Sequence, residues 1–253
     1  MPSPNVDLVF VLDASESMAP CFEQVKKHLH KVIKPMQGHI SKVNFALLAL
    51  AASKTDRGGL YKIFSIWDDD EGMGLVDAIY RPKGEPSTAR NMLFTSDPDR
   101  LIRALDRVQV KGDEDMLLAL DIALDLPFGP VADTKRVIAL FSDEPFETGL
   151  AGSESNQKLP QLIDKIQARH IQLFAAIPDG PGATQLKSVD RAELELVGGQ
   201  GGGLADVNFG TLFDQMGKTI SGSSLQLTKE PAYQRALFGQ DSWTAGHGEM
   251  TGR

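Results

Sequence analysis

The sequence predicts a doubly wound α/β fold, in which helices cover both faces of a mostly parallel central sheet. Short, almost wholly apolar runs alternate with amphipathic helical patterns along the chain. Continuous apolar runs are typical of parallel strands that are buried on both faces. Of the 253 residues, 42% are hydrophobic and 24% are charged, which is the composition of a globular protein. A chain of this length can bury a full hydrophobic core.

The predicted strands are short runs of branched and aromatic residues. The first ends at Leu12, immediately before Asp13. The second and third are separated by residues 56–59, whose Asp-Arg-Gly-Gly sequence is a turn signal, so we expect these two strands to form a hairpin. In chain order, the predicted strands are residues 8–12, 43–51, 60–67, 136–142 and 171–177.

The predicted helices begin and end at recognisable residues. Pro35 and Gly38 end the first helix, Asp97 and Pro98 form the N-cap and first position of the second, and Asn208 caps the last. Each pattern places apolar side chains on one helical face. In chain order, the predicted helices are residues 22–36, 98–108, 115–126, 159–169, 186–196 and 208–220.

We expect residues 1–222 to form one domain and residues 223–253 to form a C-terminal extension. The extension is rich in glycine and polar residues and shows no sustained period. Its isolated aromatic residues, Tyr233, Phe238 and Trp243, are interpreted as contacts with the domain or with a partner. The extension is therefore expected to pack on the domain or on a partner.

Charge and cysteine content exclude several classes of function. The chain has 26 basic and 34 acidic residues, a net charge of −8, which argues against a nucleic acid or an anionic membrane as partner. Cys21 is the only cysteine, so neither an intrachain disulfide nor a thiolate zinc cluster is expected. The amino terminus lacks the features of a secretory signal, and the longest apolar run, residues 45–52, is too short to cross a bilayer. These features predict a soluble cytoplasmic protein.

Two predicted strands end at aspartates, and this pattern indicates a metal site. Asp13 and Asp143 come directly after their strands, and the carboxyl ends of parallel strands meet at one edge of the sheet. Ser15 and Ser17 follow Asp13 at alternate positions. Carboxylate and hydroxyl oxygens that converge in this way suit a hard cation such as Mg²⁺ or Mn²⁺. The alternative for the serines alone is that they cap the helix that follows.

The segment from Leu8 to Met18, with its Asp-x-Ser-x-Ser motif, resembles the opening of a von Willebrand factor type A domain of the bacterial type. Residues 138–145 are similar to the later strand of that family, which ends in the aspartate of the metal ion dependent adhesion site. The resemblance covers about residues 5–222. It implies that Asp13, Ser15 and Ser17 are metal ligands from the first loop and that Asp143 is the ligand from the third loop.

The second loop departs from the family pattern. The family has a threonine there, but counting back from Ala119 places Glu114 at that position, next to Asp113. Either of these acidic residues is a candidate ligand, and Glu144 is a further acidic neighbour of the site. An acidic side chain in this loop favours a site that binds metal without a carboxylate from a partner.

The resemblance implies a protein-interaction module that binds one divalent cation and is not an enzyme. Bacterial relatives of this kind accompany ATPases, kinases, phosphatases or proteases in multi-component systems, including stress and phage-defence systems, so the expected role is that of an adaptor. Two alternatives remain open. The first is a magnesium-dependent phosphohydrolase with Asp13 as its nucleophile, although Ser15 stands where such enzymes need a second acid. The second is a structural domain whose metal site is degenerate.

Overall fold

The structure is a computed structural model that describes residues 4–36, 39–52, 61–66, 90, 93–110, 115–144, 155–197, 204 and 207–222. Its strands form one sheet in the order β3-β2-β1-β4-β5-β6. Five strands run parallel, and β3 is antiparallel to β2, so the predicted doubly wound fold and the predicted hairpin are confirmed. The strands are β1 (Asn5–Asp13), β2 (Lys42–Ala52), β3 (Tyr61–Ser65), β4 (Thr134–Phe141), β5 (Ile171–Pro178) and β6 (Ala192–Val197).

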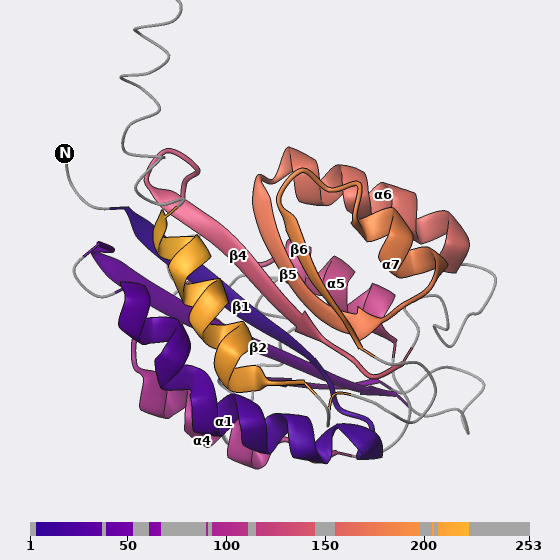
Figure 1. Cartoon of the computed structure of the whole chain (residues 1–253), viewed down its shortest axis with the longest axis horizontal. Coiled ribbons are helices and arrows are strands. Elements are labelled where there is room, and N and C mark those ends of the chain that lie inside the picture. The colour runs from indigo at the N-terminus through magenta and orange to yellow at the C-terminus, as the bar shows by residue number, and fades with distance from the viewer. Residues whose placement is uncertain are drawn as a thin grey trace, which may run out of the picture.

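Helices cover both faces of the sheet (Figure 1). On one face lie α1 (Ala19–Ile33), α4 (Pro98–Arg107) and a helix over residues 209–222. On the other face lie α5 (Met116–Leu124), α6 (Ser155–Ala168) and α7 (Pro181–Leu186). Short 3₁₀ turns at Glu16–Met18 and Lys34–Met36 precede and follow α1.

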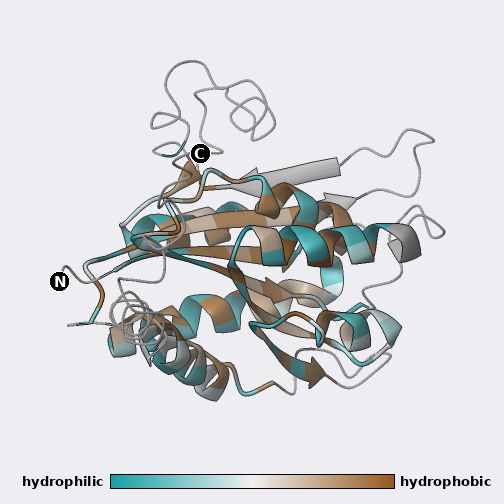
Figure 2. Ribbon diagram, turned by 90° about the horizontal axis from the view of Figure 1, so that it is seen from above, coloured by the Kyte–Doolittle hydropathy of each residue, from teal (hydrophilic) through white to brown (hydrophobic). Residues whose placement is uncertain are grey.

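Strand β1 divides the hydrophobic core into two layers. Leu8, Phe10 and Leu12 pack toward α1, whereas Val9 and Val11 pack toward α5. Figure 2 shows the resulting pattern, with apolar residues along the strands and mixed apolar and polar residues on the helices. Because the side chains of a strand alternate between its two faces, a strand covered on both sides carries a continuous apolar run, as residues 8–12 of β1 do.

The predicted helix caps are present. Asp97 Oδ1 accepts a hydrogen bond from the Asp99 N–H at 2.9 Å, and Pro98 is the first residue of α4. Asn208 Oδ1 accepts one from the Thr211 N–H at 3.1 Å. These side chains satisfy N–H groups that the first turn of a helix leaves without a partner.

The predicted helix over residues 186–196 is wrong. Helix α7 ends at Leu186, and the end of the segment forms β6, the edge strand beside β5. Ala192, Glu193, Leu194 and Glu195 alternate between half-buried and exposed, which is the period-two pattern of a strand with one solvated face. Alanine, glutamate and leucine favour helices, but the open edge of β5 overrides that preference.

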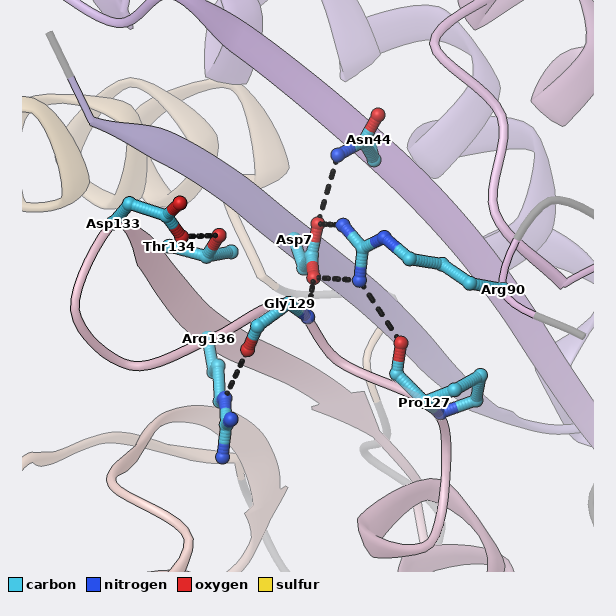
Figure 3. Close-up of polar contacts among 8 residues, drawn as sticks. All are labelled: Asp7, Asn44, Arg90, Pro127, Gly129, Asp133, Thr134 and Arg136. Atoms are coloured by element: carbon cyan, nitrogen blue, oxygen red, sulfur yellow. Dashed lines mark hydrogen bonds and ion pairs between the residues drawn. The ribbon is translucent and has the colours of Figure 1, made fainter. Parts of the chain in front are cut away.

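A buried ion pair holds together the edge of the sheet at which the parallel strands begin (Figure 3). Asp7 on β1 is fully buried and accepts two hydrogen bonds from the guanidinium of Arg90, at 2.5 and 2.6 Å. Its carboxylate also accepts hydrogen bonds from the Asn44 side chain at 2.8 Å and from the Gly129 N–H at 2.7 Å. Arg90 in addition donates to the Pro127 carbonyl at 2.9 Å. Asp7 therefore links β1 to β2, to Arg90 and to the loop before β4.

None of the helices in the described ranges is both long enough and apolar enough to cross a membrane.

Candidate metal site

The topology places a ligand crevice between β1 and β4. From β1 the chain continues to β2 and β3 on one side, and it later returns through β4 to β5 and β6 on the other side. In doubly wound sheets, ligands bind at the carboxyl edge where the strand order reverses in this way. Asp13 is the last residue of β1, and Asp143 lies two residues beyond the end of β4. Both aspartates therefore lie at the expected edge.

Hydrogen bonds connect the first loop to the loop after β4. Asp13 Oδ1 accepts a hydrogen bond from the Ser15 N–H at 2.7 Å. The Ser15 and Ser17 hydroxyl oxygens lie 3.1 Å apart. Ser17 Oγ donates to Asp143 Oδ1, also at 3.1 Å. The structure thus brings together four of the residues that the sequence singled out: Asp13, Ser15, Ser17 and Asp143.

Ser142 also belongs to this cluster, although its role was not predicted from the sequence. Its fully buried hydroxyl donates to Asp13 Oδ2 at 3.0 Å and accepts a hydrogen bond from the Glu144 N–H at 3.2 Å. Leu12 pairs with Phe141 in the sheet, so the residues that follow, Asp13 and Ser142, are neighbours. The sequence signal for this role is that a hydroxyl residue stands at the end of a buried strand and directly precedes the candidate ligand Asp143.

Burial makes the negative charge of Asp13 costly. The side chain is inaccessible to solvent, and this desolvation raises its pKa from 3.8 to about 6. Hydrogen bonds from Ser15 and Ser142 lower the pKa, whereas the charge of Asp143 raises it. Within the described part of the chain, no lysine, arginine or histidine forms an ion pair with Asp13 or Asp143. The site therefore combines two carboxylates with no neutralising side chain among these residues.

The donor set fits a hard divalent cation. Every candidate ligand atom in the cluster is an oxygen, and such ions prefer carboxylate and hydroxyl oxygens together with retained waters. The described residues contain no group of three or more His, Cys, Asp or Glu side chains that could hold a metal ion. Among the described residues, the serine hydroxyls are therefore the further candidate oxygen ligands beside Asp13 and Asp143.

Several sequence predictions lie outside the described residues. These are the predictions for Asp113 and Glu114 in the second loop, and those for Tyr233, Phe238 and Trp243 in the C-terminal extension. Glu144 is described and is exposed beside Asp143. The fold thus brings the first and third loops together, and the contribution of the second loop stays a prediction.

The sheet order and the two-sided helical cover define a doubly wound α/β domain (Figure 1). The family model of the von Willebrand factor type A domain matches residues 7–209, and the chain belongs to this family. Domains of the family serve generally in metal binding and in protein–protein interaction.

Solved structures of the same family share the fold. One is described as the crystal structure of the SpRpn10 VWA domain; it has a TM-score of 0.54 and 13% identity, and the match covers 85% of this chain and 97% of that one. Another is described as von Willebrand factor type A from Catenulispora acidiphila; it has a TM-score of 0.50 and 16% identity, and the match covers 88% of this chain and 43% of that one. A comparison with curated proteins finds no match.

Proposed function

We propose that this protein is a divalent-metal-binding interaction module whose metal site is built on Asp13, Ser15, Ser17 and Asp143. The observation that carries the proposal is the hydrogen-bonded series from Asp13 through both serines to Asp143, at the carboxyl edge between β1 and β4. The donor set consists of carboxylate and hydroxyl oxygens, which suit hard cations, and we propose Mg²⁺ or Mn²⁺ as the bound ion.

Each residue has a separate task in the proposed site. Asp13 supplies a buried carboxylate, and hydrogen bonds from Ser15 and Ser142 fix the direction of its two oxygens. Asp143, which is partly exposed, supplies the carboxylate on the solvent side. A bound cation supplies positive charge, which offsets the cost of ionised Asp13 and attracts acidic groups at the surface.

The second loop decides whether a carboxylate of the partner can coordinate the bound cation. In our proposal Glu114, or its neighbour Asp113, adds a third carboxylate that either reaches the ion or repels an incoming acidic ligand through the local field. The site then binds metal without a carboxylate from the partner, and recognition relies mainly on the surrounding loops or on the extension with Tyr233, Phe238 and Trp243.

The proposed cellular role is that of a cytoplasmic adaptor in a bacterial multi-component system, whose partner is an ATPase, kinase, phosphatase or protease. The net charge of −8 supports a protein partner over a nucleic acid or an anionic membrane. Stress response and phage defence are the settings that the family resemblance favours.

A pull-down from the native host tests this role. The full chain, Asp143→Ala and a control, Asp164→Ala, are used as baits with Mg²⁺ or with EDTA. Asp164 is an exposed aspartate within α6, away from the carboxyl edge of the sheet. We expect a partner that the parent and Asp164→Ala retain only with Mg²⁺, and that Asp143→Ala loses. Equal recovery by all three baits in EDTA would contradict a metal-dependent interaction.

The alternative of a phosphohydrolase is less favoured by the residues around Asp13. Such an enzyme also needs a general acid or base near its nucleophile, whereas the described hydrogen-bond partners of Asp13 are Ser15 and Ser142. Ser15 again replaces the second acid that such an enzyme uses. We therefore propose that the protein is not an enzyme. Hydrolysis of p-nitrophenyl phosphate with Mg²⁺, lost in Asp13→Asn, would reverse this conclusion.

A further inference from the structure

The distal half of α1 carries a concentration of basic side chains in a chain whose net charge is −8. Lys27, His30, Lys31 and Lys34 follow one another on the outer side of the helix and its 3₁₀ extension. Among the described residues, none of these four forms an ion pair, whereas Lys26 pairs with Glu23 and with Asp106. The charge is thus concentrated where the described structure does not neutralise it.

The adjoining helix adds to this positive charge. Lys31 Nζ lies against Gly210: if residue 210 had a Cβ atom, that atom would be 2.5 Å from Lys31 Nζ. Gly210 is in the first turn of the helix over 209–222, and the start of a helix carries a partial positive charge. The pKa of His28 is lowered, first by desolvation and then by the charges of Lys31, Lys27 and His30. These like charges repel one another, and an anionic partner would relieve the repulsion.

Two hollows flank this basic surface, and His30 and Lys34 line both. The first, of about 430 Å³, lies between α1 and α4 and is here named the α1–α4 groove. Leu29, Ile33 and Ile102 give it an apolar lining. The second, of about 400 Å³, lies between α1 and the helix over 209–222 and is mainly polar. Apolar and cationic surfaces therefore lie side by side along α1.

The acidic residues around these hollows indicate how a ligand would lie. Asp214 lines the polar hollow, but its carboxylate is 2.6 Å from Lys218 Nζ and is neutralised there. Asp99 is exposed on the α4 wall of the groove and would repel an acidic group placed next to it. Acidic groups of a ligand are therefore favoured over α1 and the polar hollow, and not over α4.

We propose that this region is a docking surface for an acidic amphipathic helix of a protein partner. Its apolar side chains fill the α1–α4 groove, and its carboxylates contact His30, Lys31 and Lys34. The pattern is that of an amphipathic helix laid in a groove, with the apolar contacts supplying affinity and the charges supplying orientation. A free phosphate or an anionic lipid headgroup would leave the apolar lining of the groove uncovered.

The surface is separate from the proposed metal site and does not depend on it. Helix α1 begins near Ser17 at the metal edge and runs away from it, so Lys31 lies about 20 Å further along, at 1.5 Å per residue. Binding at the docking surface should therefore persist in EDTA. Failure of the peptide to bind would therefore not count against the proposed metal site. Failure to bind metal would likewise not count against the docking surface.

Fluorescence anisotropy with a designed peptide tests the proposal on the full chain. The probe is a labelled helix of about 18 residues, five turns long, with leucines spaced three and four apart and glutamates and alanines elsewhere. Two companion peptides carry serine in place of leucine, or lysine in place of glutamate. We expect the acidic leucine peptide to bind in EDTA at least tenfold more tightly than either companion, and to weaken as salt is added.

Charge-reversal variants locate the binding site. Lys31→Glu/Lys34→Glu should weaken the acidic peptide about tenfold, and Ile102→Ser should weaken it several-fold. The matched control is Lys158→Glu/Lys187→Glu, which changes the net charge equally at exposed lysines outside both hollows and should bind as the parent does. If the double variant is unstable, Lys34→Glu alone, which changes an exposed side chain, is used to measure the loss of peptide affinity.

Three results would overturn the proposal. Equal losses in the control and the α1 variant would show a general charge effect, and equal binding of the serine peptide would show that the groove is not used. Binding to phosphatidylserine vesicles in preference to the acidic peptide would assign the surface to a membrane.

Discussion

Replacing Asp13 by asparagine should stabilise the metal-free protein while removing its response to metal. Asp13 is fully buried, and its hydrogen-bond partners can all be kept by the amide. The asparagine oxygen accepts from the Ser15 N–H, and the Ser142 hydroxyl, which also lies 3.4 Å from the Glu144 carbonyl, can turn to accept from the amide nitrogen. The substitution therefore removes a buried charge and leaves the shape of the site unchanged.

The size of the effect follows from the raised pKa. The folded-state pKa of Asp13 is about 6 and the ordinary value is 3.8, a difference of about 2 pH units, which corresponds to about 3 kcal/mol. Because the folded-state value is the higher one, the parent keeps this stability below about pH 4 and loses it as the pH rises through 6. Asp13→Asn does not titrate, so its advantage should be near zero at pH 4 and about 3 kcal/mol above pH 7.

Urea unfolding in EDTA at several pH values measures this difference. Taking the difference between variant and parent removes the contribution of the other titrating groups. The companion variant Asp143→Asn removes a partly exposed carboxylate and should change the metal-free stability by less than about 1 kcal/mol. If Asp13→Asn were no more stable than the parent at pH 7.5 in EDTA, the charge of Asp13 would be compensated without metal, and no cation would be needed to offset it.

Three further predictions concern other parts of the chain. Arg90→Met leaves the buried carboxyl group of Asp7 without its cationic partner, so urea unfolding should show a loss of about 3 kcal/mol. The control Arg103→Met, whose ion pair is exposed, should lose less than about 1 kcal/mol. Equal losses would refute the role of Asp7. Glu114→Thr should leave the fold intact, weaken Mg²⁺ affinity in calorimetric titration and allow an acidic ligand to coordinate, whereas tighter metal binding would contradict this. Removing the residues after Tyr233 should leave a folded domain with weaker binding to its native partner, and aggregation of the shortened chain would show that the extension belongs to the core.

Much of the fold could be predicted because the buried strands and the helix caps are local signals. Strand β1 is apolar on both faces, and Asp97 and Asn208 cap their helices through the residues next to them. The exception is β6, whose Ala192–Val197 sequence suits a helix by composition. Its strand conformation comes from pairing with β5, a contact that no local pattern contains.

The candidate site was predictable in its carboxylates but not in its supporting contacts. Asp13 and Asp143 follow buried strands, and the rule that ligands bind at the carboxyl edge predicts their meeting. The hydrogen bond from Ser142 to Asp13 depends on the pairing of β1 with β4, which are separated by more than 100 residues. The Asp7–Arg90 ion pair was missed for the same reason, because the two residues are 83 positions apart.

The melting temperature of the parent, Asp13→Ala and Asp143→Ala, with and without Mg²⁺ or Mn²⁺, tests the proposed metal site most directly. A ligand that binds only the folded state at about one hundred times its dissociation constant stabilises that state by about 2.7 kcal/mol. For a chain of this length, that corresponds to a rise in Tm of about 5–10 °C. We predict this rise for the parent and none for either variant. An unchanged melting curve of the parent at millimolar metal, or an equal rise in all three proteins, would contradict a cation held by Asp13 and Asp143.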